Sequence, residues 1–110
     1  MEKTRLTLHQ ELIDLLGSPN VYYNPPETIK MNFPCIVYSL DYYDQIHANN
    51  KKYIDWTTYK VIVVSKKPDH PAIRKLLDKE MTRFSTQYTR DGYYHDVIIL
   101  KQKEKQLCQS

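Results

Sequence analysis

The sequence predicts one α+β domain, with a mostly antiparallel sheet of about four strands and two helices packed on one face. The chain has 110 residues, close to the commonest size of a single domain. Two segments have the apolar spacing of helices, and the other ordered segments are rich in β-branched and aromatic residues. We therefore expect a single domain over residues 1–100 and a flexible charged arm at 101–110.

The first helix is predicted over residues 6–16, because its leucines recur on one stripe. Gly17 supplies the residue type that commonly ends a helix. The second helix is predicted to begin after Asp69, a capping residue, with Pro71 in its first turn. Its apolar face continues far enough that we expect the helix to end near Thr82.

The strands are predicted as two antiparallel hairpins, 34–44 with 53–65 and 83–90 with 93–102. The polar segment 45–52 connects the first pair, and the tight-turn dipeptide Asp91-Gly92 connects the second. Residues 21–23 are a further short strand candidate, which ends where prolines remove ladder donors.

Composition excludes several classes of function. The two glycines, Gly17 and Gly92, lie far apart, so neither common type of glycine-rich phosphate loop is present. The net charge of +3, from 16 basic and 13 acidic residues, is too small to predict a nucleic-acid-binding protein by itself. The longest apolar run, 61–64, is far shorter than a membrane span, so we expect no membrane partner and synthesis inside the cell.

Candidate catalytic and metal-ligating residues are few. The four histidines lack the spacing of a zinc site, and Cys35 lies in an apolar run where a thiol stays protonated. Asp41, Asp44 and Asp55 lie near strand ends, where carboxylates are usually solvated or paired with nearby lysines such as Lys51 and Lys52, so we do not expect a catalytic pair. We expect a protein that is not an enzyme and that holds no metal and no cofactor.

Aromatic residues are concentrated on the first hairpin. Because a strand alternates faces, some of its tyrosines and Trp56 must point away from a helix-covered core. An aromatic face of that kind favours a partner surface, with intramolecular packing as the alternative. Lys51 and Lys52 in the hairpin loop, and Lys101, Lys103 and Lys105 in the arm, add short basic clusters.

Several stretches of the chain resemble small tail-completion proteins of long-tailed bacteriophages. The similarity covers residues 6 to about 100 and is structural rather than catalytic in kind. It rests on PPETIKMNFPCIVY (25–38), NKKY (50–53), YKVIVV (59–64), KPDHPA (67–72) and DGYYHD (91–96). The resemblance implies a tail terminator, an α+β subunit of a six-membered ring that caps the tail tube and joins it to the head connector.

The resemblance also implies partners and sites. The expected partners are further copies of the chain, the tail tube protein and the connector or stopper protein, in the neck of a virion assembled in the bacterial cytoplasm. DNA would pass through the bore without sequence-specific binding, facing Lys51 and Lys52. The expected interface residues are Tyr42, Tyr43, Asn49, Asn50, Lys51, Lys52, Tyr53 and Trp56. The arm bearing Lys101, Lys103 and Lys105 would become ordered on a neighbour.

Two alternatives remain open at this point. One is a head-side adaptor or stopper, another ring protein of the same neck. The other is a small nucleic-acid-binding regulator that uses lysines on phosphates and tyrosines on bases.

Overall fold

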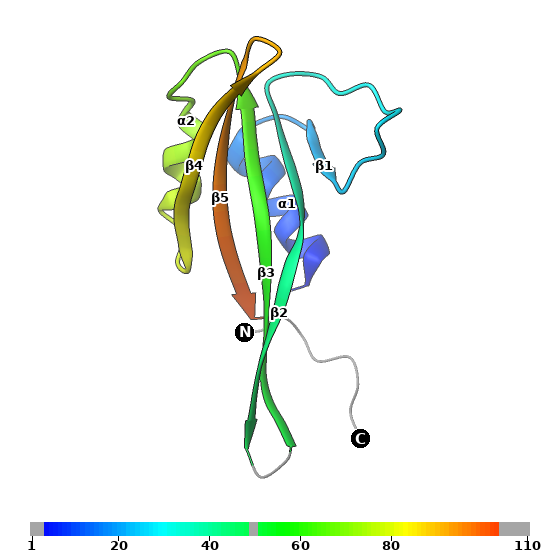
Figure 1. Ribbon diagram of the computed structural model, residues 1–110, viewed down its shortest axis with the longest axis vertical. Helices are drawn as coiled ribbons and strands as arrows, with labels where there is room; N and C mark the ends of the chain where they lie inside the picture. Colours follow the sequence, from blue (N-terminus) through cyan, green and yellow to red (C-terminus); the bar gives the residue numbers. More distant parts are fainter. Residues whose placement is uncertain (1–3, 49–50, 104–110) are drawn as a thin grey trace.

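The computed structural model of the protein describes residues 4–48 and 51–103, with side chains for 4–43 and 56–103. Two helices and five strands follow one another along the chain (Figure 1). They are α1 (Arg5–Leu16), β1 (Val21–Tyr23), β2 (Cys35–Ala48), β3 (Lys51–Ser65), α2 (Pro71–Leu77), β4 (Thr82–Arg90) and β5 (Tyr93–Lys103).

The five strands form one mixed sheet in the order β1-β2-β3-β5-β4. Three of the four pairings are antiparallel, and β1 runs parallel to β2 over three residues. Both helices lie on the same side of the sheet, behind it in Figure 1. The predicted α+β class is confirmed. The sheet has five strands rather than about four, because the short segment 21–23 pairs with Ile36–Tyr38.

Capping sets the ends of both helices. The Thr4 side chain accepts a hydrogen bond from the Thr7 backbone N–H, and Gly17 ends α1 with φ 78°. The cap of α2 is His70, whose side chain accepts from the Ala72 N–H, and not Asp69 as predicted. The helix ends at Leu77, short of Thr82, and the chain then turns sharply into β4. Neither described helix combines the length and the apolar character that crossing a bilayer requires.

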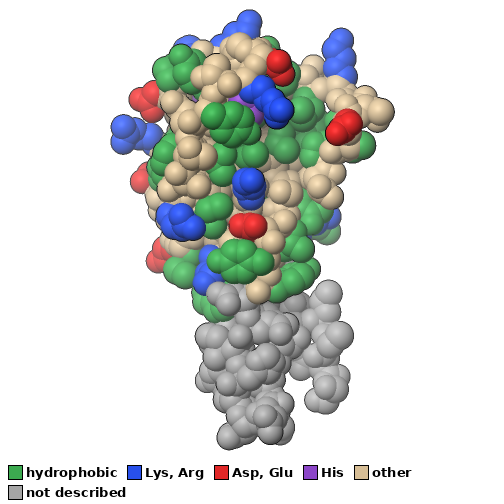
Figure 2. Space-filling view, in the orientation of Figure 1, with side chains coloured by type: hydrophobic (Ala, Val, Ile, Leu, Met, Phe, Trp, Pro, Cys, Tyr) green, Lys and Arg blue, Asp and Glu red, His purple; other side chains and the backbone are tan. Residues whose placement is uncertain are grey.

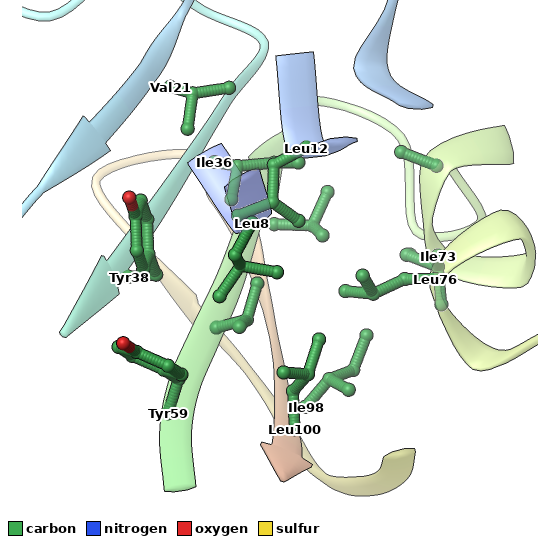
Figure 3. Close-up of a cluster of buried hydrophobic side chains, with 13 residues drawn as sticks. Leu8, Leu12, Val21, Ile36, Tyr38, Tyr59, Ile73, Leu76, Ile98 and Leu100 are labelled. Carbon is green, nitrogen blue, oxygen red and sulfur yellow. The ribbon is translucent and has the colours of Figure 1, made fainter. Parts of the chain in front are cut away.

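The hydrophobic core lies between the helices and one face of the sheet (Figure 3). Leu8 and Leu12 of α1 and Leu76 of α2 are completely buried there. On the sheet side, alternate residues point into this layer; among them are Ile36, Tyr38, Tyr59, Val61, Val63, Ile98 and Leu100. Burying each aliphatic side chain of this size contributes about 1.5–3 kcal/mol, so this single layer is the main stabilising feature of the fold.

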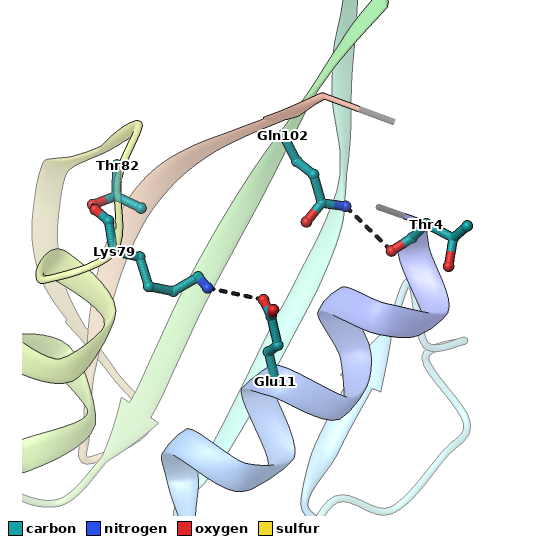
Figure 4. A network of polar contacts seen from close by, with 5 residues as sticks. All are labelled: Thr4, Glu11, Lys79, Thr82 and Gln102. Carbon is teal, nitrogen blue, oxygen red and sulfur yellow. Dashed lines mark hydrogen bonds and ion pairs between the residues drawn. The ribbon is translucent and has the colours of Figure 1, made fainter. Parts of the chain in front are cut away.

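The C-terminal strand continues further than the predicted domain boundary. Lys101 and Lys103 belong to β5, so the prediction that the flexible arm begins at 101 is wrong. The reason is a set of contacts that a polar sequence does not reveal: Gln102 is buried, and its Nε2 donates to the Thr4 carbonyl oxygen at 3.2 Å (Figure 4). Residues 104–110, including Lys105, lie outside the described residues.

A candidate assembly surface

The hairpin of β2 and β3 extends beyond the rest of the sheet (Figure 1). The last residue of β5, Lys103, is level with Trp56 of β3. Past that level the described part of β3 pairs only with β2, through Gln45–Ala48. A two-stranded ribbon in water is marginally stable by itself, because it has no layer to pack against. The projection therefore has the geometry of a segment that is stabilised by a partner.

The base of this projection presents aromatic side chains on both faces. Tyr42 and Tyr43 are 49% and 65% exposed. Tyr42 lies opposite Thr58, on the face away from the helices, and Tyr43 lies opposite Thr57, on the helix side. Half-buried Trp56 shares the face of Tyr42 by strand alternation. The predicted patch of three aromatics is thus divided between two surfaces of one ribbon.

A β-bulge causes that division. The pairing of β2 with β3 shifts between Leu40 and Tyr42, which leaves Asp41 as the extra residue. Tyr42 and Tyr43, the described side chains of β2 after the bulge, therefore lie on the opposite faces from those that simple alternation predicts. Asp41 is itself exposed.

The structure describes the other predicted residues of the hairpin less completely. Asn49 and Asn50 lie outside the described residues. For Lys51, Lys52 and Tyr53 the structure describes the backbone, which belongs to β3. Their assignment to the bore or the tube stays a prediction.

The face of the sheet opposite the helices carries two hollows (Figure 2). A cavity of about 420 Å³ lies at one end, where Met31 and Phe33 from the β1–β2 loop approach Ile62 and Tyr88. A second, of about 260 Å³, lies nearer the projection and includes Tyr42 among its lining residues. Figure 2 shows hydrophobic side chains among single charged groups on this face.

A third cavity, of about 590 Å³, combines aromatic and basic side chains. Phe33 stacks on Tyr93 with 4.4 Å between ring centroids, and Lys66 Nζ is 5.8 Å from the Tyr93 ring centroid. Exposed Lys67 also lines it. The sequence pattern does not reveal this cluster, because its aromatic members come from segments about sixty residues apart.

One carboxyl group is deeply buried. Asp96 is 2% exposed, and its Oδ1 accepts from Gln87 Nε2 at 2.6 Å, whereas its Oδ2 contacts no hydrogen-bond donor among the described residues. Burial is the main cause that raises the pKa of Asp96, and the negative charge of Asp69 raises it further. A single buried carboxyl is not by itself an acid–base pair. The described residues contain no group of three metal-ligating side chains.

The three carboxylates considered in the sequence analysis, Asp41, Asp44 and Asp55, are not seen as one cluster among the described side chains. Asp41 stands on the bulge, Asp44 is level with Trp56, and Asp55 pairs with Gln45 in the projection. The side chains of Asp44 and Asp55 are outside the description. What the described residues bring together instead are exposed aromatic and apolar groups, which are suited to binding a macromolecule.

Two other titratable groups serve the core. His9 Nδ1 lies 2.6 Å from the Tyr38 hydroxyl, so the half-buried His9 side chain faces the sheet. Burial, and then the charge of Arg5, lower the pKa of His9. Burial raises the pKa of the Cys35 thiol to about 11, consistent with the inert cysteine expected from the sequence.

No protein-family model and no curated protein sequence matches the chain.

Proposed function

We propose that this protein is a subunit of the ring that caps the tail tube of a long-tailed bacteriophage and joins the tail to the head connector. The observation that carries the proposal is the hairpin of β2 and β3, which continues past β5 and has exposed aromatic residues at its base. Two of the motifs that resemble tail-completion proteins lie in β3 of this hairpin. The NKKY motif includes the first residues of β3, and YKVIVV lies in its second half, where Tyr59, Val61 and Val63 are buried.

In this proposal the protein acts by assembly and not by chemistry. Copies of the chain form a closed ring in the virion neck, one ring face contacts the tail tube protein, and the other contacts the connector or stopper. DNA passes through the bore, where Lys51 and Lys52 neutralise phosphates without reading bases. A ring needs two different patches on each subunit, and the projecting ribbon supplies one of them.

The test combines an assembly assay with a point substitution. Trp56→Ala removes an aromatic side chain at the base of the projection, where it is half-buried. We expect this variant to lose assembly on tail-tube ends, measured by native mass spectrometry, with an unchanged circular dichroism spectrum. Leu6→Ala is the matched control, because Leu6 is an exposed apolar residue on α1. If Trp56→Ala unfolds the domain, or assembles like the native chain, the assignment of Trp56 to the assembly surface is wrong.

A neighbouring ring of the same neck, the head-side adaptor or stopper, is the nearest alternative. It shares the ring architecture, so only the partner distinguishes it. Binding to filled heads rather than to tail tubes would favour it.

A nucleic-acid-binding regulator is the second candidate, and the aromatic and basic cavity favours it. Phe33 and Tyr93 could stack on bases while Lys66 and Lys67 contact phosphates. Such a protein binds DNA with an affinity that falls steeply as salt rises. Absence of DNA binding at low salt removes this candidate.

A further inference from the structure

The sheet has two open edges. On one side, β1 covers only Ile36–Tyr38 of β2, and no described strand pairs with that side of β2 from Ser39 onward. On the other side, β4 pairs with β5 alone and leaves its second edge open. An open strand edge presents unpaired N–H and C=O groups, which another strand can satisfy.

The two edges carry opposite charge. The open stretch of β2, residues 39–48, contains Asp41 and Asp44 and neither lysine nor arginine. β4 contains Arg83 and Arg90 and no acidic residue. No ion pair with another described residue engages Asp41, Arg83 or Arg90. Pairing either edge with its own copy would bring like charges together, whereas pairing β4 with β2 brings opposite charges together.

The strand directions also favour this unlike pairing. Three successive antiparallel pairings connect β2 to β4, so these two strands run in opposite directions within one chain. A second copy rotated about an axis parallel to the strands therefore meets the first in an antiparallel arrangement. Each edge offers an uninterrupted run after its own bulge: Tyr42–Ala48 on β2, with seven residues, and Thr86–Arg90 on β4, with five.

The position of β1 sets the offset between copies. Within one chain, β4 begins level with Leu40 of β2, but the open run of β2 lies beyond that level, toward the projection. A neighbour must therefore be displaced along the strand direction. Closed sheets accommodate such a stagger by inclining their strands to the ring axis by about 35–45°.

We propose that β4 of one copy pairs antiparallel with the open β2 edge of the next copy, so that the sheets of a ring continue head to tail. The partner is thus a second copy of this chain. This inference rests on the proposed function and specifies its subunit contact. Exposed Tyr42 and Tyr88, one on each run, add apolar contact at the joint.

Charge exchange between the edges tests the pairing. One variant, Arg83→Glu/Arg90→Glu, makes β4 acidic, and another, Asp41→Lys/Asp44→Lys, makes the β2 edge basic. We expect each to lose rings in native mass spectrometry, because each places like charges at every joint. A one-to-one mixture should restore rings that contain equal numbers of both chains. When the two variants alternate around the ring, every joint pairs an acidic edge with a basic edge. A chain with all four substitutions should form rings alone.

Controls separate this result from general effects of charge or misfolding. Arg74→Glu/Lys75→Glu makes the same charge change as the β4 variant at exposed positions of α2, and it should leave rings intact. Circular dichroism checks each fold. If the β4 reversal does not fold, Arg83→Gln/Arg90→Gln replaces it, with a partial loss of rings expected.

Three outcomes overturn the inference, and they can be distinguished. If the native chain forms rings and both folded edge variants form them equally well, the edge pairing is wrong and the proposed function stands. Failure of the mixture to restore rings, although each variant is folded and defective, is also evidence against head-to-tail pairing. If the native chain forms no ring, alone or on tube ends, the proposed function and the edge pairing fail together.

Discussion

The hydroxyl of Tyr38 is a sensitive test of how α1 is attached to the sheet. The Tyr38 side chain is completely buried, and its hydroxyl contacts His9 Nδ1 at 2.6 Å and accepts from Arg5 Nη1 at 3.3 Å. Because Arg5 donates to this oxygen, the hydroxyl proton is available for the ring nitrogen of neutral His9. The lowered pKa of His9 is consistent with this arrangement.

Tyr38→Phe removes both hydrogen bonds and keeps the ring. Each net hydrogen bond contributes about 0.5–1.5 kcal/mol, so we expect the free energy of unfolding to fall by about 1–3 kcal/mol. In a domain near this size, each kcal/mol lowers Tm by about 4–8 °C.

Urea denaturation followed by circular dichroism measures the change. Tyr88→Phe is the matched control, because Tyr88 is 40% exposed and its hydroxyl is within reach of no described hydrogen-bond partner. We expect the control to change the free energy of unfolding by less than about 0.5 kcal/mol, as is usual for surface substitutions. A Tyr38→Phe variant as stable as its control would refute the account of how α1 is held.

Asp96 and Cys35 give two further predictions. The folded state raises the pKa of Asp96 above its unfolded value of 3.8. The contribution of Asp96 to the free energy of unfolding is therefore complete below pH 3.8, and it is lost as the pH rises through the pKa of the folded state. Asp96→Asn keeps an oxygen that accepts from Gln87. We expect it to raise the free energy of unfolding at pH 7 but not at pH 3. An equal effect at both pH values would contradict the raised pKa of Asp96. With the pKa of Cys35 raised to about 11, iodoacetamide should alkylate this thiol slowly at pH 8 in the folded chain and rapidly in guanidinium. Peptide mass spectrometry measures both rates, and similar rates would show that the thiol is accessible.

Much of the fold follows from local signals that the tertiary structure reinforces. The leucine spacing predicts the start of α1 within one residue, and Gly17 predicts its end. Both succeed because the apolar spacing and the capping residue favour the same helix. Asp91-Gly92 locates the tight turn between β4 and β5, since both residues adopt positive φ there. At the end of α2 the local signals do not agree in this way: the apolar face suggests a longer helix than the chain forms.

The candidate surface was less predictable, because it depends on pairing between distant segments. Aromatic density on one hairpin indicates a partner surface, but it does not separate buried Tyr38 from exposed Tyr43. The bulge at Asp41 decides which face each later residue occupies, and nothing in the local composition marks it. The role of Gln102 as a buried donor to Thr4 likewise depends on where the two chain ends meet.

The most direct test of the central claim is native mass spectrometry of the purified protein, alone and mixed with tail-tube ends. The account predicts a closed ring of this chain, six-membered if it follows the family that it resembles, in at least one of the two samples. A persistent monomer that ignores tube ends and binds DNA in a salt-dependent manner would contradict it.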